Sequence, residues 1–285
     1  MATFLIGNSA VFQNKKLFCK FTANTVSTRS PLLIMWTVWA ALFLREALWR
    51  LFSRRGAWAW LLLEPAFHIF YLIFIYTVLN VRHISGFDTS MWIVVGVVAF
   101  FIFDRTSSQT ANAISANKSL FSYRQVLPAD ALFVRAVVEL VLTLFAGLLV
   151  LLLLSLFGHQ VLPDNLLAVI QAIFGLWLLA LGWGLVRAVL SDLVPEIDIV
   201  LNLIMRPMYL ISGLMLPLSS LPPGYRDWLV LNPVAQGLEA ARAGFSAAYH
   251  PFTGLSFSYL YASAFLILFS GLLLLRKFGL RLVTE

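Results

Sequence analysis

Ionisable side chains fall inside or at the edges of long apolar segments of this 285-residue sequence. A charged group costs about 2.5–3.5 kcal/mol near the centre of a bilayer, so each is a candidate for function or for pairing. Arg206 is the least expected, because it precedes Pro207 within an apolar run and needs a protein partner, a water-filled path or an anionic substrate. Most of the others are explained by pairing or snorkelling at helix ends. They are Glu64, Asp104, Arg105, Glu139, Arg187, Asp192, Glu196 and Asp198.

Aromatic residues are the second group with recognisable chemistry, at 14% of the chain. An aromatic face can stack on the C–H face of a sugar ring. Membrane-interface belts and helix packing explain any single ring more simply. The rings that lie inside or at the ends of apolar segments include Tyr71, Tyr76, Trp92, Trp177, Trp183 and Tyr209.

Motifs for nucleotide, metal or hydrolytic chemistry are missing from the sequence. A P-loop ends in Gly-Lys, and none of the five lysines follows a glycine. There is no nucleophile elbow or His-Glu-x-x-His helix. Cys19 is the single cysteine and the four histidines are scattered, so neither a disulfide nor a metal site is expected. We expect a chain that is not an enzyme and has no cofactor, with any ATP and magnesium held by a partner.

The composition places these residues in a membrane. The chain is 61% apolar and 12% charged, with a mean hydropathy of +0.89, whereas soluble domains are about 45–50% apolar and about 25% charged. Six apolar segments have the ~20 residues needed to cross a bilayer. They are 57–80, 89–111, 131–157, 165–190, 197–217 and 255–275. The sequence therefore predicts an all-α polytopic membrane protein with a six-span domain over 57–275.

An amphipathic helix is predicted ahead of the first span, over 31–55. Pro31 suits a first helical position, and apolar residues follow at the 3,4 spacing of one helix face. Arg45 and Arg50 lie off that apolar stripe. We expect this helix to lie in the membrane interface with its cations facing anionic lipid. The alternative is a seventh span over 32–44, which is short for that purpose.

The basic residues indicate the orientation. If the N-terminus is cytoplasmic, sixteen of the 20 Lys and Arg residues face the cytoplasm, as the positive-inside rule requires. The net charge of +7 is then explained by topology rather than by nucleic acid. Residues 1–30 and the tail 276–285 are predicted to be cytoplasmic. The proline-rich segment 217–254 faces outward in this topology, and we expect it to be re-entrant or to lie at the outer face.

The loop 117–130 reads NKSLFSYRQVLPAD and is basic and aromatic. A short helix in such a loop could press into a groove of a partner and transmit its motion. The alternative is a solvated connector.

The sequence resembles the permease subunits of the second type of bacterial ABC exporter, in particular those that export capsular polysaccharide. Three features carry the resemblance over nearly the whole chain. They are the arginine-bearing helix followed by Glu64-Pro65, the string LFSYRQVLPAD followed by Arg135 and Glu139, and the segment 212–245 with Asn232, Pro233 and Arg242. The last feature is shared with O-antigen and teichoic-acid exporters, whereas the string from Tyr123 to Pro128 points to capsule.

The resemblance implies a homodimer of six-span permeases, each paired with a cytoplasmic ABC ATPase subunit, in the bacterial inner membrane with both termini cytoplasmic. The cargo is a lipid-linked acidic polysaccharide. A periplasmic adaptor of the co-polymerase type and an outer-membrane channel carry the polymer onward.

The resemblance also implies roles for individual residues. The substrate path contains Arg45, Arg50, Arg54, Arg55, Tyr71, Tyr76, Trp92, Trp177, Trp183, Arg206 and Tyr209, with the first four meeting the phosphate-bearing lipid end. ATPase coupling falls to Asn117, Lys118, Phe121, Tyr123, Arg124, Gln125, Pro128, Asp192 and Glu196. The outer gate contains Pro222, Pro223, Asn232, Pro233 and Arg242.

Two other readings stay open. The same architecture could export another lipid-linked glycan or a small hydrophobic drug. A membrane-embedded transferase acting on polyprenyl lipids would need clustered carboxylates for magnesium. The nearest cluster, Asp192, Glu196 and Asp198, fits a partner contact at least as well.

Overall fold

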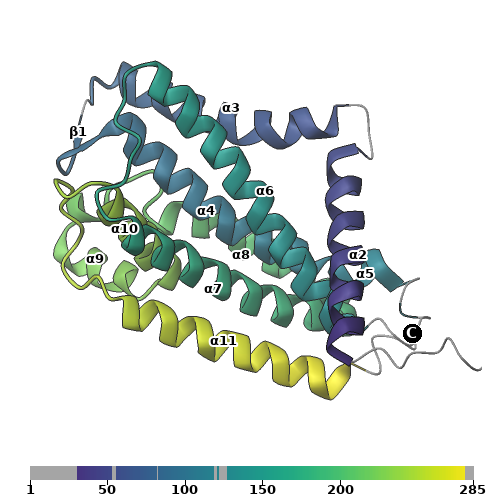
Figure 1. Ribbon diagram of the computed structural model, residues 1–285. Helices are drawn as coiled ribbons and strands as arrows, with labels where there is room; N and C mark the ends of the chain where they lie inside the picture. The colour runs from purple at the N-terminus through teal and green to yellow at the C-terminus, as the bar shows by residue number, and fades with distance from the viewer. Residues whose placement is uncertain (1–30, 53–55, 82, 119–120, 122–126, 280–285) are drawn as a thin grey trace, which may run out of the picture. The chain divides into compact units, whose positions relative to one another are not determined.

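The computed structural model describes residues 31–52, 56–81, 83–118, 121 and 127–279. The chain divides after Ala40 into two units, and the packing below concerns residues 41–285. Helices make up most of the described part (Figure 1). They are α2 (Pro31–Phe52), α3 (Ala57–Val78), α4 (Thr89–Ala111), α5 (Ala113–Asn117), α6 (Pro128–Leu156), α7 (Leu166–Leu193), α8 (Pro195–Ile211), the 3₁₀ turn η2 (Leu218–Ser220), α9 (Pro223–Val230), α10 (Pro233–Phe245) and α11 (Phe257–Phe278).

Five of these helices are long and apolar enough to cross a membrane: α3, α4, α6, α7 and α11. They coincide with five of the six segments expected from the sequence. The sixth segment, 197–217, contains α8, which has 17 residues, includes Pro207 and ends at Ile211. The described part is thus mostly helical and polytopic, and the sixth span stays a prediction.

One small sheet connects α3 to α4, a feature that the sequence did not indicate. Strands β1 (His83–Ile84) and β2 (Phe87–Asp88) pair antiparallel, and His83 lies opposite Asp88. Gly86 occupies the tight turn with a φ of 87°, which favours glycine. The Asp88 side chain then caps α4 by accepting a hydrogen bond from the Met91 amide at 3.1 Å.

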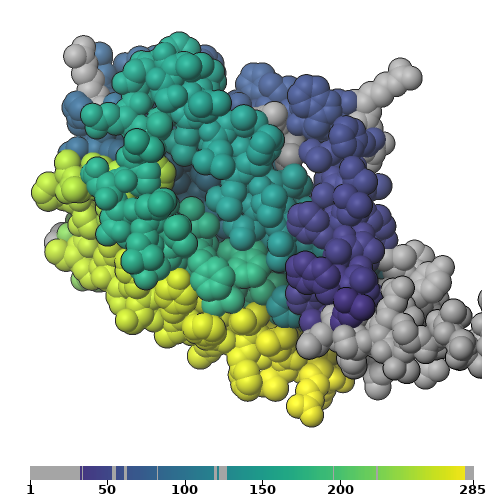
Figure 2. Space-filling model, viewed as in Figure 1, coloured from purple at the N-terminus to yellow at the C-terminus, as the bar shows by residue number. Residues whose placement is uncertain are grey.

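Helix α4 forms the centre of the core. Of its most apolar stretch 78% is buried, against 19% for α3 and 22% for α11. It packs against α6, α7 and α10, while α11 lies along α7 (Figure 1). In the space-filling view, α6, α7 and α11 form much of the visible surface and α4 is largely hidden behind them (Figure 2). Helices α3 and α11 therefore leave most of their apolar side chains exposed on the surface of the single chain.

Helices α7 and α11 approach closely because Gly182 has no side chain. A Cβ atom there would lie 2.6 Å from the Leu268 amide nitrogen and 2.8 Å from its Cα. Gly271 has the same role on α11, where a Cβ would lie 2.7 Å from the Leu185 Cβ. Small residues at such crossings let helix backbones pack closely in membranes.

We expect Gly182→Ala to lower the free energy of unfolding by about 1–3 kcal/mol, the usual cost of overpacking, because the facing atoms belong to rigid backbone. The measurement is the thermal unfolding midpoint of the purified protein in detergent. Gly224→Ala is the matched control, because a Cβ at Gly224 meets nothing within 4 Å. Equal midpoints for the two variants would contradict the proposed crossing.

The proline-rich segment predicted over 217–254 folds into η2, α9 and α10. Pro223 and Pro233 begin α9 and α10, where the missing amide hydrogen has no cost. Asn232 caps α10 by accepting from the Val234 amide at 3.0 Å, and it donates to the Ser212 hydroxyl at 3.2 Å. Helix α10 packs against α7 and α4 and is mostly buried. Whether this segment is re-entrant in a membrane stays a prediction.

Candidate functional site

Two arginines and two glutamates form a buried group between α2 and α6, here called the ionic network. Its members are Glu46, Arg50, Arg135 and Glu139, whose side chains are 10%, 14%, 7% and 2% exposed. Each helix contributes one acid and one base four residues apart, a spacing that places both on one helix face. Burial of four charges together is tolerated only when they compensate one another.

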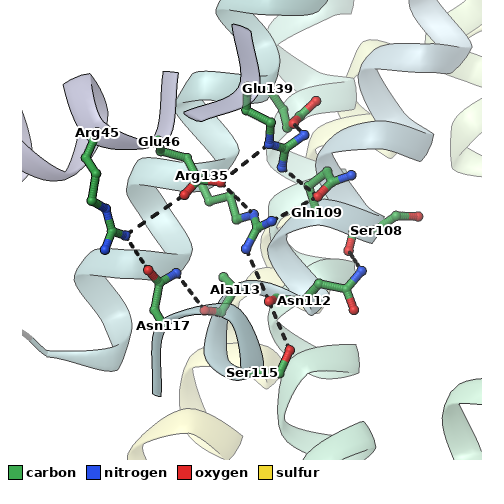
Figure 3. Close-up of polar contacts among 11 residues, drawn as sticks. Arg45, Glu46, Ser108, Gln109, Asn112, Ala113, Ser115, Asn117, Arg135 and Glu139 are labelled. Carbon is green, nitrogen blue, oxygen red and sulfur yellow. Dashed lines mark hydrogen bonds and ion pairs between the residues drawn. The ribbon is translucent and has the colours of Figure 1, made fainter. Parts of the chain in front are cut away.

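Every member of the ionic network lies next to an opposite charge. Arg50 Nη1 pairs with Glu139 Oε1, and its Nε lies 3.4 Å from Glu46 Oε1. Arg135 Nε lies 3.2 Å from the same Glu46 oxygen. Gln109 of α4 accepts hydrogen bonds at Oε1 from Arg50 Nη2 at 2.6 Å and from Arg135 Nη2 at 3.2 Å. Three helices are thereby joined at one place (Figure 3).

The ionic network continues into the short helix α5. Arg135 Nη1 donates to the Asn112 carbonyl at 3.2 Å, directly before α5. Arg45 Nη2 donates to the Asn117 side chain at the end of α5, and Asn117 Nδ2 donates to the Ala113 carbonyl at 2.8 Å (Figure 3). A displacement of α5 would therefore alter its hydrogen bonds to Arg45 of α2 and to Arg135 of α6.

The structure corrects the expected orientation of α2. Arg50 faces the protein through Glu46, Gln109 and Glu139 rather than facing lipid headgroups. The exposed positions in the second half of this helix are largely apolar: Leu44, Leu48, Trp49 and Phe52. The expectation for Arg50 is therefore wrong, because its partners lie on α2, α4 and α6, whereas the Arg45 side chain is 45% exposed and its contact with headgroups stays a prediction.

The break between α7 and α8 has its own polar cluster. The Arg187 side chain is 2% exposed, and its Nη2 donates to Asp198 Oδ1 at 3.1 Å and to Asn202 Oδ1 at 2.7 Å. The Ser191 hydroxyl donates to the same Asp198 oxygen at 3.1 Å. On the other side of this break, Lys118 Nζ lies 3.6 Å from Asp192 Oδ1. The end of α5 and the α7–α8 junction are therefore neighbours.

Another buried arginine, Arg242 of α10, is fully enclosed together with Glu239. Its Nη1 lies 3.0 Å from Glu239 Oε1 and donates to the Gly213 carbonyl at 2.8 Å. Its guanidinium carbon lies 3.6 Å from the centroid of the Trp92 ring. Gly96 makes room, because a Cβ there would lie 2.2 Å from Arg242 Nη2.

Tyr249 completes this group, here called the Arg242 cluster: Arg242, Glu239, Trp92 and Tyr249. The Tyr249 hydroxyl donates to Glu239 Oε2 at 2.8 Å and lies 3.3 Å from Trp92 Nε1. Burial, assisted by the neighbouring Glu239 carboxylate, raises the pKa of Tyr249 well above its usual range, so the hydroxyl stays protonated as a donor. The cluster links α10, α4 and the turn after α8.

Comparison with known proteins decides the family. Residues 37–246 match the model of the ABC-2 type transporter membrane family. The chain belongs to that family. The ABC-2 chain is 33% identical over 236 residues to the polysialic acid transport protein KpsM of Escherichia coli, covering 83% of this chain and 91% of KpsM.

More distant relatives of the ABC-2 chain carry related names. The capsule polysaccharide export inner-membrane protein CtrC of Neisseria meningitidis serogroup A is 24% identical over 75% of this chain and 81% of CtrC. The capsule polysaccharide export inner-membrane protein BexB of Haemophilus influenzae is 24% identical over 88% of this chain and 94% of BexB. The similarity therefore extends over most of each protein.

The predicted substrate-path residues of the ABC-2 chain differ in exposure: some are buried in the core and others lie on the surface. Trp92 is fully buried beneath Arg242, so it is out of reach of a polymer in this structure. Trp177 donates to the Ala136 carbonyl of α6 at 3.0 Å, and Trp183 packs against the core. Tyr71 is 57% exposed on α3. Arg206 is exposed on α8, on the same helix as many exposed apolar side chains.

Helices α3 and α8 are joined by a hydrogen bond between a predicted tyrosine, Tyr209, and a histidine, His68. The Tyr209 hydroxyl forms a hydrogen bond with His68 Nε2, and the Tyr209 ring contacts Phe100 edge-on. The Tyr76 hydroxyl donates to the Met215 carbonyl. His68 was not singled out by the sequence analysis as a site residue.

Several predicted coupling and gate residues are also placed. Phe121 is buried against α5, α6 and α7, and Pro128 begins α6. Glu196 is exposed in the first turn of α8, and Pro222 is exposed before α9. Arg54, Arg55, Tyr123, Arg124 and Gln125 lie outside the described residues.

Partners that sequence reasoning missed include Gln109, Glu239 and Tyr249. Only Glu239 had a readable signal, since it precedes Arg242 by three residues, an ion-pair spacing on a helix. Gln109 and Tyr249 lie far from their partners in the sequence and are brought in by tertiary packing alone.

Proposed function

We propose that this chain is the transmembrane subunit of an ATP-driven exporter of capsular polysaccharide in the bacterial inner membrane. The observation that carries the proposal is the 33% identity to a polysialic acid transport protein over 91% of that protein. Membership of the ABC-2 transporter family over residues 37–246 supports transport rather than catalysis.

The energy source in this proposal is a separate ABC ATPase, paired with each half of a homodimer. Its docking site is the cleft of about 240 Å³ between α5 and the α7–α8 junction. The cleft is lined by polar groups that include Asn112, Ser115, Ser191 and Asp192. The segment that carries α5 is hydrogen-bonded to Arg45 of α2 and to Arg135 of α6. In this proposal, movement of α5 by the ATPase is therefore transmitted to α2 and α6.

The cargo in this proposal is a lipid-linked acidic polysaccharide, passed onward to a periplasmic adaptor and an outer-membrane channel. The distribution of Lys and Arg supports cytoplasmic termini. In that orientation the ionic network lies at the cytoplasmic ends of the spans, and the Arg242 cluster lies toward the outside. Export of another lipid-linked glycan, such as an O-antigen or a teichoic acid, is the outcome to be distinguished.

Deleting the gene in its encapsulated host tests the function. We expect the polymer to accumulate inside the cell and to return to the surface when a plasmid copy is supplied, as measured by fractionation and polymer-specific antibody. Polymer that still reaches the surface would contradict the capsule assignment. Loss of all polymer would instead indicate a role in synthesis.

A further inference from the structure

A second polar cleft, of about 690 Å³, lies beside the ionic network between α2, α3, α4 and α6. Its volume is within the roughly 300–1,000 Å³ typical of ligand sites. Trp60 and Glu64 line it from α3, and Asp104, Arg105 and Ser108 line it from α4. None of these five residues was assigned to the substrate path by the sequence. We call this the Trp60 cleft.

Both arginines of the Trp60 cleft are already paired with carboxylates. Arg105 Nη2 donates to Glu64 Oε2 at 2.7 Å. Arg50, which also lines the cleft, is paired with Glu139. With Asp104, the lining of the cleft contains three carboxylates but only two arginines, Arg50 and Arg105. A phosphate or a carboxylated sugar would therefore have to displace a carboxylate from one of the arginines and would still meet an excess of negative charge.

Hydrogen-bonding groups in the Trp60 cleft remain available. Among the described residues, none donates a hydrogen bond to the Asp104 carboxylate, and the Ser108 hydroxyl has no hydrogen-bond partner there. Gln109 uses its carbonyl oxygen for two arginines, which leaves its amide nitrogen as a donor. Carboxylate acceptors, hydroxyls and amides together match the alternating donors and acceptors of vicinal sugar hydroxyls.

Trp60 supplies a flat apolar surface at the same cleft. Its side chain is 64% exposed and lines the cleft. An indole face packs well against the C–H face of a pyranose ring, whose edge carries the hydroxyls. A lipid tail would use the indole but would leave the facing Asp104 and Ser108 without hydrogen bonds.

We infer that the Trp60 cleft binds an uncharged sugar ring, stacked on Trp60 and hydrogen-bonded to Asp104 and Ser108. This inference rests on the proposed function. It adds that the glycan and the lipid phosphate are recognised at different places in the chain. The cleft selects a neutral unit even when the exported polymer as a whole is acidic.

Saturation-transfer NMR on the full chain in phosphatidylcholine nanodiscs tests this inference. The probes are maltotetraose, a sialic acid tetramer and glycerol 3-phosphate, each at millimolar concentration. We expect transfer to maltotetraose to exceed transfer to either anion. Trp60→Ala should reduce it about fivefold, the loss expected for one stacking partner, and Trp60→Phe should largely restore it. Asp104→Asn should also reduce it.

Trp58→Ala is the matched control, because Trp58 is 55% exposed on the same helix and does not line the cleft. Equal signals from Trp60→Ala and Trp58→Ala, a stronger signal from either anion, or no signal from maltotetraose would overturn the inference. These results are distinguishable from failure of the proposed function, since that is decided by polymer export in the deletion strain, whatever the cleft binds.

Discussion

Replacing Arg242 by alanine is expected to lower the free energy of unfolding by about 3–5 kcal/mol, because the fully buried Glu239 would lose its opposite charge. The loss is a large part of the roughly 5–15 kcal/mol that stabilises a typical domain. Three carbonyl groups, from Trp92, Gly213 and Leu214, would lose a donor as well. We therefore expect little folded protein in the membrane, measured by fluorescence-detected size exclusion of a tagged permease.

Two further variants separate this effect from a general sensitivity of the region. Arg226→Ala on α9 should leave the elution profile unchanged, since Arg226 makes no ion pair with the described residues. The double variant Arg242→Met with Glu239→Leu should recover part of the folded protein, because it removes both buried charges. A normal profile for Arg242→Ala alone would show that the Arg242 cluster does not hold the fold together.

Replacing Arg50 by alanine is expected to reduce surface polymer by at least about tenfold, since a loss of about 3–5 kcal/mol is typical when one partner of a buried pair is removed. The Glu139 side chain is 2% exposed, and Arg50 is its only ion-pair partner among the described residues. Export is measured per cell, together with the amount of folded permease and its thermal midpoint. Arg45→Ala should have a much smaller effect, because the Arg45 side chain is 45% exposed.

A second substitution at Glu139 distinguishes two explanations for a defect in Arg50→Ala. If Arg50 acts by compensating Glu139, the double variant Arg50→Gln with Glu139→Gln should regain much of the export. If Arg50 acts by holding a lipid phosphate, the double variant should be as defective as the single one. Wild-type export from a well-expressed Arg50→Ala would exclude both roles.

The five longest apolar helices were largely predictable because each contains an apolar run of the length that a membrane requires. The match is closest for α4, where the expected segment 89–111 equals Thr89–Ala111. The Asp88 cap explains the sharp beginning of that helix. Helix α6 begins at Pro128, earlier than the expected residue 131, since its first polar turn carries no hydropathy signal.

The partners of the charged residues were much less predictable. Hydropathy identified Arg206 as an unusual residue, yet Arg206 is exposed on α8. Arg242, in a less apolar stretch, is fully enclosed. A hydropathy pattern reports only how apolar the residues adjacent in the sequence are. It carries no information on Trp92 and Gly213, which come from other segments and supply the actual surroundings of Arg242.

The ionic network also bears on how the chain enters the membrane during synthesis. Arg135 and Glu139 belong to α6, and each carries a cost of about 2.5–3.5 kcal/mol if it reaches the bilayer centre alone. Glu46 and Arg50 precede α6 in the chain, so both are synthesised before Arg135 and Glu139. We therefore expect the compensating charges of α2 to be available when α6 inserts, which would lower the cost of its two charged side chains.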